Sequence, residues 1–178
     1  MNAPWGFYLN SISGAALCAL LAGLLWSVTP ENLPRREAWT RHKLCGIVMA
    51  YIAFIVCVPY AKVVSPDFLI PLLWPLALTM PVVCGWFVDY PTARGVGGLA
   101  ILLAYLVVHA GFEMKIPGAP LFAAAAWLLG IAGIWLSALP WKLRDLFRAG
   151  EKVRRAWAVF LFVFAMLLVL ETVLWALR

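Results

Sequence analysis

Six runs of apolar residues, each close to 20 residues long, constrain the fold of this chain more than any other feature. An α-helix needs about 20 residues to cross the roughly 30 Å of hydrocarbon in a bilayer. A helix also satisfies its own backbone hydrogen bonds, which a chain in lipid must do. The runs therefore predict transmembrane helices, at residues 6–28, 44–64, 68–88, 95–114, 119–139 and 156–177.

The composition excludes a water-soluble domain. Apolar residues make up 65% of the chain and charged residues 12%, against roughly 45–50% and about 25% in soluble domains. We expect an all-α integral membrane protein, a compact bundle of about six transmembrane helices that forms a single domain over residues 1–178. The net charge of +6 does not predict nucleic-acid binding, because the basic residues lie in the short gaps between apolar runs.

The basic residues predict the orientation of the bundle, because Lys and Arg in short loops stay on the cytoplasmic side. One set of alternate gaps holds Arg35, Arg36, Arg41, Lys43, Arg94, Lys142, Arg144, Arg148, Lys152, Arg154 and Arg155. The other set, with both termini, holds Lys62, Lys115 and Arg178. We therefore expect both termini on the non-cytoplasmic side of a bacterial inner (plasma) membrane. Residues 1–29 contain no Lys or Arg, so we do not expect a cleaved secretory signal.

Two of the expected spans carry residues that affect helix shape and packing. Each proline inside a helix removes a backbone hydrogen bond and favours a kink. The third span is therefore predicted to be kinked, at Pro71, Pro75 and Pro81. Small residues four apart allow two helices to approach closely. The first span contains two such series, Gly14, Cys18 and Ala22, and Ala15, Ala19 and Gly23.

The gap at residues 141–155 is predicted to form a short amphipathic helix on the cytoplasmic surface, between spans five and six. Apolar residues recur in it at helical spacing, namely Leu143, Leu146, Phe147 and Val153. Its basic residues form a patch that faces anionic lipid or a partner protein. This patch consists of Lys142, Arg144, Arg148, Lys152, Arg154 and Arg155. A basic loop that only fixes topology remains the alternative.

The most chemically suggestive residues are His109, Glu113 and Glu171. Ionisable groups inside a span are costly and often functional, and His109 and Glu171 lie at similar depths in the outer leaflet. Glu113 follows His109 by four residues, so both share one helix face. Such a cluster could relay protons, contact a quinone or hold a cation. In the alternative interpretation, Glu171 only stabilises the bundle, alone or paired with His109.

Cofactor and catalytic motifs are weak in this sequence. One haem cannot bridge His42 and His109, because His42 lies in a cytoplasmic gap and His109 near the other face; single-histidine haem ligation or quinone binding stays open. The glycine-rich stretch at 94–98 lacks the strand and the Lys-Ser or Lys-Thr of a phosphate loop. No hydrolase or metalloprotease motif is present, and the four cysteines are expected to be buried apolar residues. We therefore predict no cofactor, and the sequence leaves enzyme activity undecided.

Three functions remain open from the sequence. The first is a non-catalytic structural or accessory subunit of a larger membrane complex, with lipids and other membrane subunits as its partners. The second is a small transporter or channel in which His109 and Glu171 handle a proton or substrate. The third is an outer-leaflet protein that binds a quinone, haem or lipid.

Overall fold

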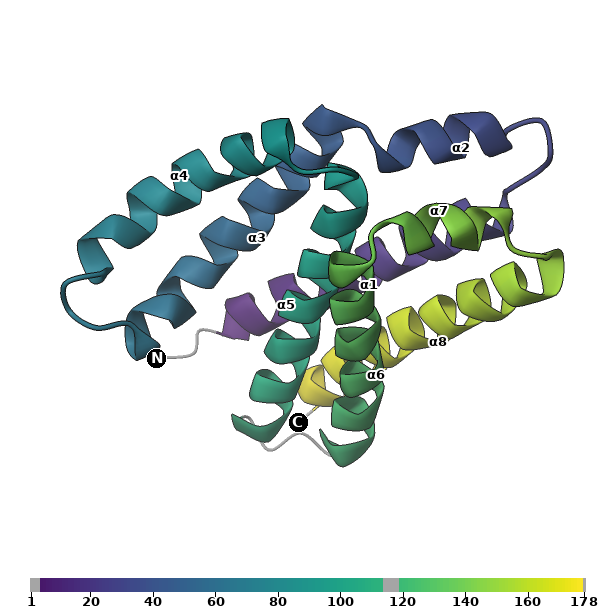
Figure 1. The fold of residues 1–178 in the computed structure, drawn as a ribbon. Helices are drawn as coiled ribbons and strands as arrows, with labels where there is room; N and C mark the ends of the chain where they lie inside the picture. Colours follow the sequence, from purple (N-terminus) through teal and green to yellow (C-terminus); the bar gives the residue numbers. More distant parts are fainter. Residues whose placement is uncertain (1–3, 114–118, 178) are drawn as a thin grey trace. The chain divides into compact units, whose positions relative to one another are not determined.

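The computed structural model describes residues 4–113 and 119–177, and these residues form helices with no strand among them (Figure 1). The prediction of an all-α fold is confirmed for this part of the chain. The helices are α1 (Pro4–Trp26), α2 (Leu33–Thr40), α3 (Lys43–Val64), α4 (Ile70–Phe87), α5 (Pro91–Glu113), α6 (Ala119–Ala138), α7 (Trp141–Arg148) and α8 (Glu151–Ala176).

Five helices are long and apolar enough to cross a membrane. They are α3, α4, α5, Pro120–Ala138 of α6 and Glu151–Leu174 of α8. In α1 a shorter apolar stretch, Ser11–Trp26, has the same character. Met114, the expected end of the fourth span, lies outside the described residues, as does Lys115.

Two helices begin earlier than the apolar runs predict. α5 begins at Pro91 rather than at residue 95, because proline fits the first turn of a helix, where its missing N–H is not needed. α8 begins at Glu151 rather than at residue 156. An acidic residue is favourable at a helix N-terminus, and Glu151 also pairs with Arg155 one turn later. Polar first turns thus extend both helices beyond their apolar segments.

The short helix between spans five and six is confirmed, but it is shorter than predicted. α7 ends at Arg148, and Gly150 separates it from α8. Leu143 and Phe147 are buried, as the amphipathic pattern requires. The assignment of Val153 to this helix is wrong, because Val153 lies in the first turn of α8 and is 51% exposed. Lys152, Arg154 and Arg155 likewise belong to α8.

The sequence patterns did not predict α2, which is short and polar. The turn before it is organised by Asn32, whose Oδ1 accepts from the backbone N–H of Thr29 at 2.9 Å. The Nδ2 of Asn32 donates to the carbonyl of Ser27 at 2.7 Å. Pro34 then occupies the first turn of the helix.

α4 is a continuous helix despite its prolines. Pro71 lies in the first turn, and only Pro75 and Pro81 are interior. Two hydroxyl groups donate to carbonyls next to the prolines: Thr79 Oγ1 to Pro75 O at 2.9 Å, and Tyr51 OH of α3 to Leu78 O at 2.8 Å. These bonds give two backbone carbonyls in the proline-containing turns an additional side-chain donor.

The chain divides into two compact units. Unit 1 comprises Met1–Leu33, Leu103–Ile131 and Asp145–Arg178; unit 2 comprises Pro34–Leu102 and Ala132–Arg144. In unit 1, α1 packs along α8, and in unit 2, α3 packs along α4 (Figure 1). The expectation of one domain over residues 1–178 stays a prediction.

Candidate functional site

Glu171 lies on the buried stripe of α8 in unit 1. Ala158, Leu161, Leu168 and Glu171 follow one another at helical spacing, and all four are buried. The exposed fraction of Glu171 is 0%. Neither carboxyl oxygen has a hydrogen-bond partner among the described residues. A buried carboxyl group without a partner is costly, so this position needs an explanation beyond packing.

A hydrogen bond joins the end of the α1 segment to the start of α8. Arg154 Nη2 donates to the carbonyl of Val28 at 3.1 Å, so the end of α1 lies beside the start of α8. Glu171 follows Arg154 by 17 residues, about 25 Å of helix. Ser11, which precedes Val28 by 17 residues, is also buried. Thr172, next to Glu171, is buried as well, and its Oγ1 donates to Val169 O at 2.5 Å.

His109 and Glu113 form a pair on the outer face of α5. His109 Nε2 lies 3.2 Å from Glu113 Oε2, and their side chains are 47% and 45% exposed. The Tyr105 ring stacks on His109, with the ring centroids 5.6 Å apart. Leu103 and Val107 are buried on the opposite side of the same helix. These three polar side chains therefore line a surface, not the interior of unit 1.

The structure thus brings together two of the three predicted cluster residues. His109 pairs with Glu113, while Glu171 forms no hydrogen bond or ion pair with any described residue. The interpretation in which Glu171 is paired with His109 is wrong. No group of three or more His, Cys, Asp or Glu side chains suited to a metal ion occurs in residues 4–113 and 119–177. A functional role for His109, Glu113 and Glu171 stays a prediction.

The small residues of α1 divide into a buried and an exposed set. Gly14, Ala15, Cys18 and Ala22 are buried, whereas Ala19 and Gly23 are exposed. A Cβ atom on Gly14 would collide with the Leu103 side chain, while one on Gly23 would have no neighbour within 4 Å. Only one side of α1 is therefore used for close packing inside this chain.

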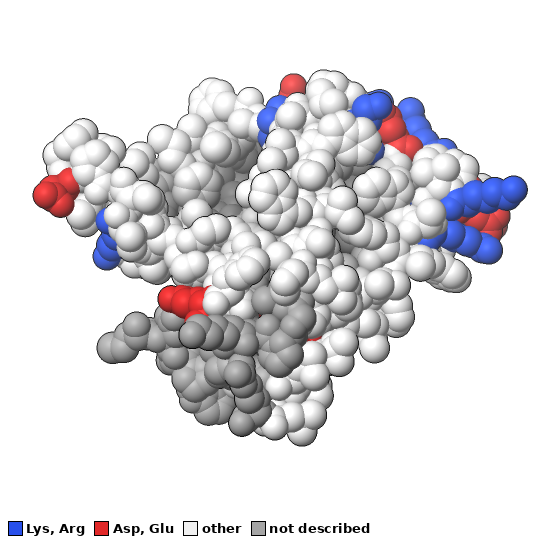
Figure 2. Space-filling model, turned by 90° about the horizontal axis from the view of Figure 1, so that it is seen from below, with Lys and Arg blue, Asp and Glu red and all other residues white. Residues whose placement is uncertain are grey.

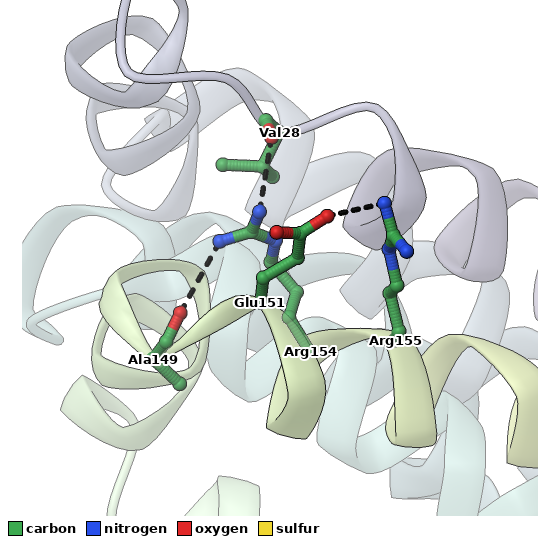
Figure 3. A network of polar contacts seen from close by, with 5 residues as sticks. All are labelled: Val28, Ala149, Glu151, Arg154 and Arg155. Carbon is green, nitrogen blue, oxygen red and sulfur yellow. Dashed lines mark hydrogen bonds and ion pairs between the residues drawn. The ribbon is translucent and has the colours of Figure 1, made fainter.

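The arginines at the start of α8 have partners within unit 1 (Figure 3). Arg154 donates to two backbone carbonyls, those of Ala149 at 3.2 Å and Val28 at 3.1 Å. Arg155 forms an ion pair with Glu151 and lies over the Trp26 ring, 5.4 Å from its centroid. These two members of the predicted basic patch bind the chain itself. Arg148 and Lys152 are exposed.

In unit 2, the basic residues gather around Tyr90, between α4 and α5. Arg41 Nη2 donates to the phenol oxygen of Tyr90 at 2.7 Å, and Arg144 Nη1 donates to it at 3.2 Å. The backbone of Tyr90 has a φ of 55°, a conformation that non-glycine residues adopt rarely and at some cost. Lys142, the remaining patch residue, lies 5.8 Å from the centroid of the Trp135 ring.

Arg94, in the first turn of α5, donates to two backbone carbonyls. Its Nε donates to Asp89 O at 3.3 Å and its Nη1 to Ser137 O at 2.7 Å. Arg94 also lines a pocket of about 310 Å³ formed by α3, α4 and the start of α5. The sequence interpretation used Arg41 and Arg94 only as markers of topology. Their convergence on one loop could not be seen, because it depends on how α3, α4 and α5 pack.

His42 has a structural role at the start of α3. Its Nδ1 accepts from the backbone N–H of Cys45 at 3.3 Å, which caps the helix. The carbonyl of His42 accepts from Thr92 Oγ1 at 2.8 Å. These contacts tie the beginning of α3 to the beginning of α5.

The described surface exposes many large apolar side chains. Large apolar side chains such as Phe68, Val63 and Phe87 are 73%, 86% and 85% exposed, and most of the face in Figure 2 carries no charged residue. Soluble proteins rarely expose apolar surface on this scale. With five long apolar helices, the fold is consistent with a multi-pass integral membrane protein. Comparison with models of known families, with curated proteins and with solved structures gives no match.

Proposed function

We propose that this chain is a non-catalytic subunit of a larger membrane complex and crosses the bilayer six times. α1, with 23 residues, is the proposed sixth span, in addition to the five long apolar helices. The distribution of Lys and Arg between alternate gaps supports two non-cytoplasmic termini. The location proposed is a bacterial inner (plasma) membrane, with lipids and other membrane subunits as partners.

The observation that carries the subunit role is the uncovered surface of α3. Only 11% of its apolar window is buried, against 44% in α5. Leu44, Val48, Ile52 and Ile55 are all exposed on α3. At about 100° per residue they fall within about 80° of one side of the helix. We infer that a partner subunit covers this stripe, because Leu and β-branched side chains pack closely where two helices meet.

Site-specific photo-crosslinking in native membranes tests this role. We expect a crosslinker at Val48 or Ile52 to give one discrete protein adduct. A crosslinker at Phe162 or Met166 on α8 is the matched control, because these side chains are exposed to a similar degree and are expected to face lipid. Lipid adducts alone from all four positions, together with migration as a lone chain on native gels, would contradict the proposal.

A small transporter or channel is the second candidate, and the buried, unpartnered carboxyl group of Glu171 favours it. Intramembrane acidic residues commonly mark proton or substrate paths. Glu171→Gln should then abolish transport in proteoliposomes, and His109→Ala should reduce it. Unchanged transport in both variants would rule out this mechanism.

A further inference from the structure

The pocket in unit 2 is apolar and lined mostly by small residues. Its walls come from α3, α4 and the start of α5, and include Gly46, Ala50, Gly85, Gly95 and Gly98. Its volume, about 310 Å³, is at the lower end of the range for small-molecule sites. Arg94 is the one charged residue among the lining residues.

Close backbone contacts hold the pocket walls in place. A Cβ atom on Gly46 would lie 2.5 Å from the carbonyl carbon of Pro91, and one on Gly95 would lie 2.8 Å from Met49 Cβ. Gly98 differs, because a Cβ atom there would have no neighbour within 4 Å. The glycines at 46 and 95 therefore join α3 to α5, whereas Gly98 borders open space.

The guanidinium group of Arg94 is positioned but not neutralised. Two backbone carbonyls, of Asp89 and Ser137, accept from it, which uses two of its five N–H donors. Among the described residues no carboxylate forms an ion pair with it. The remaining donors can bind an anion in the bidentate geometry that guanidinium groups favour.

Two further guanidinium groups meet at the side chain of Tyr90. Arg41 and Arg144 both donate to the phenol oxygen of Tyr90, the residue directly before Pro91 of the pocket wall. The start of α5 adds the partial positive charge of a helix N-terminus.

We propose that this pocket binds an anionic amphiphile, with a phosphate group held by Arg94 and Arg41 and an apolar chain lying against Gly98. A phospholipid of the inner leaflet has this chemistry, since basic pockets at the cytoplasmic ends of spans bind anionic head groups. The site does not depend on the proposed subunit role, and it assigns to Arg41 and Arg94 a function beyond topology.

Native mass spectrometry of the full chain in mild detergent tests the site. The probes are dioleoyl phosphatidylglycerol, dioleoyl phosphatidylcholine and inorganic phosphate. We expect the chain to retain phosphatidylglycerol at least fivefold better than phosphatidylcholine, and millimolar phosphate not to displace it. Arg94→Ala should lower retention at least fivefold. Gly98→Leu should do the same, because its Cβ atom would have no neighbour within 4 Å and the rest of its side chain would occupy space in the pocket.

Matched controls separate this site from general surface charge. Arg155→Ala removes an arginine that already pairs with Glu151, and Gly23→Leu adds the same side chain at another open glycine; both should retain the lipid. Equal losses in Arg94→Ala and Arg155→Ala would overturn the proposal. So would full retention in Gly98→Leu, equal retention of the two lipids, or displacement by phosphate alone. If Arg94→Ala does not fold, Arg41→Gln replaces it with the same expectation.

Discussion

Packing alone does not explain the surroundings of the Glu171 carboxyl group. A buried polar group without a partner costs about 1–3 kcal/mol, and an apolar side chain of similar size removes this cost. We therefore expect Glu171→Leu to increase the free energy of unfolding by about 1–3 kcal/mol. Reversible unfolding in mixed detergent micelles, followed by circular dichroism, measures the change.

Two further variants make this prediction specific to the carboxyl group. Met166→Leu, at an exposed position of the same helix, should leave stability unchanged. Glu171→Gln keeps a polar group in the same place and should give no increase. If Glu171→Leu instead lowers the free energy of unfolding as much as a disrupted core does, the prediction is contradicted. That result would show that the carboxyl group has a bound partner.

The sequence predicts that Glu171 lies within the last apolar helix, but it could not show that Glu171 lies on the buried face of that helix. α8 is apolar on every side: Leu161 and Leu168 are buried, whereas Phe162 and Met166 are exposed. In such a helix the pattern of residue types does not indicate which face packs inward. For the same reason the sequence could not show that His109, on α5, faces outward.

Glycines in the helices differ in how closely neighbouring atoms approach them, and Gly97 and Gly98 of α5 show this difference. A Cβ atom on Gly97 would lie 2.7 Å from the carbonyl oxygen of Gly133 in α6, whereas one on Gly98 would have no neighbour within 4 Å. Gly97→Ala should therefore destabilise the chain by about 1–3 kcal/mol, the usual cost of overpacking. Gly98→Ala should be neutral or stabilising by up to about 1 kcal/mol, because alanine favours a helix. Thermal unfolding of the two variants compares them; equal effects would contradict this α5–α6 contact.

Element boundaries and packing faces were predicted unevenly. Apolar runs located the long helices to within a few residues, because length and hydropathy alone define a possible span. The small residues of α1 offered two equivalent stripes, and the sequence could not favour Cys18 over Ala19 as the buried position. α2 was missed because a short polar helix has no periodic apolar signal.

For the whole molecule, the Lys and Arg residues of the gaps bear on both the orientation of the chain and the contacts between its segments. Only the orientation can be predicted from their positions in the sequence. Counting Lys and Arg by gap predicts an orientation without any knowledge of contacts. The gathering of Arg41, Arg94 and Arg144 around one loop depends on contacts between segments distant in the chain. A count by gap treats these arginines like any other loop charge, so the pocket beside them was not predicted.

The six-span proposal and a five-span protein differ in the side of the membrane on which the N-terminus lies. If α1 crosses the bilayer, both termini lie on the non-cytoplasmic side. If α1 does not cross, the N-terminus stays with the basic gap before α3 and is cytoplasmic, while the C-terminus is unchanged. Epitope tags at the two ends, probed with protease on intact spheroplasts, distinguish these cases. We expect both tags to be cleaved and a tag inserted at Gly150 to be protected. The two ends of a chain lie on the same side only when the chain crosses the membrane an even number of times. If the N-terminal tag is protected while the C-terminal tag is cleaved, α1 is therefore not a span.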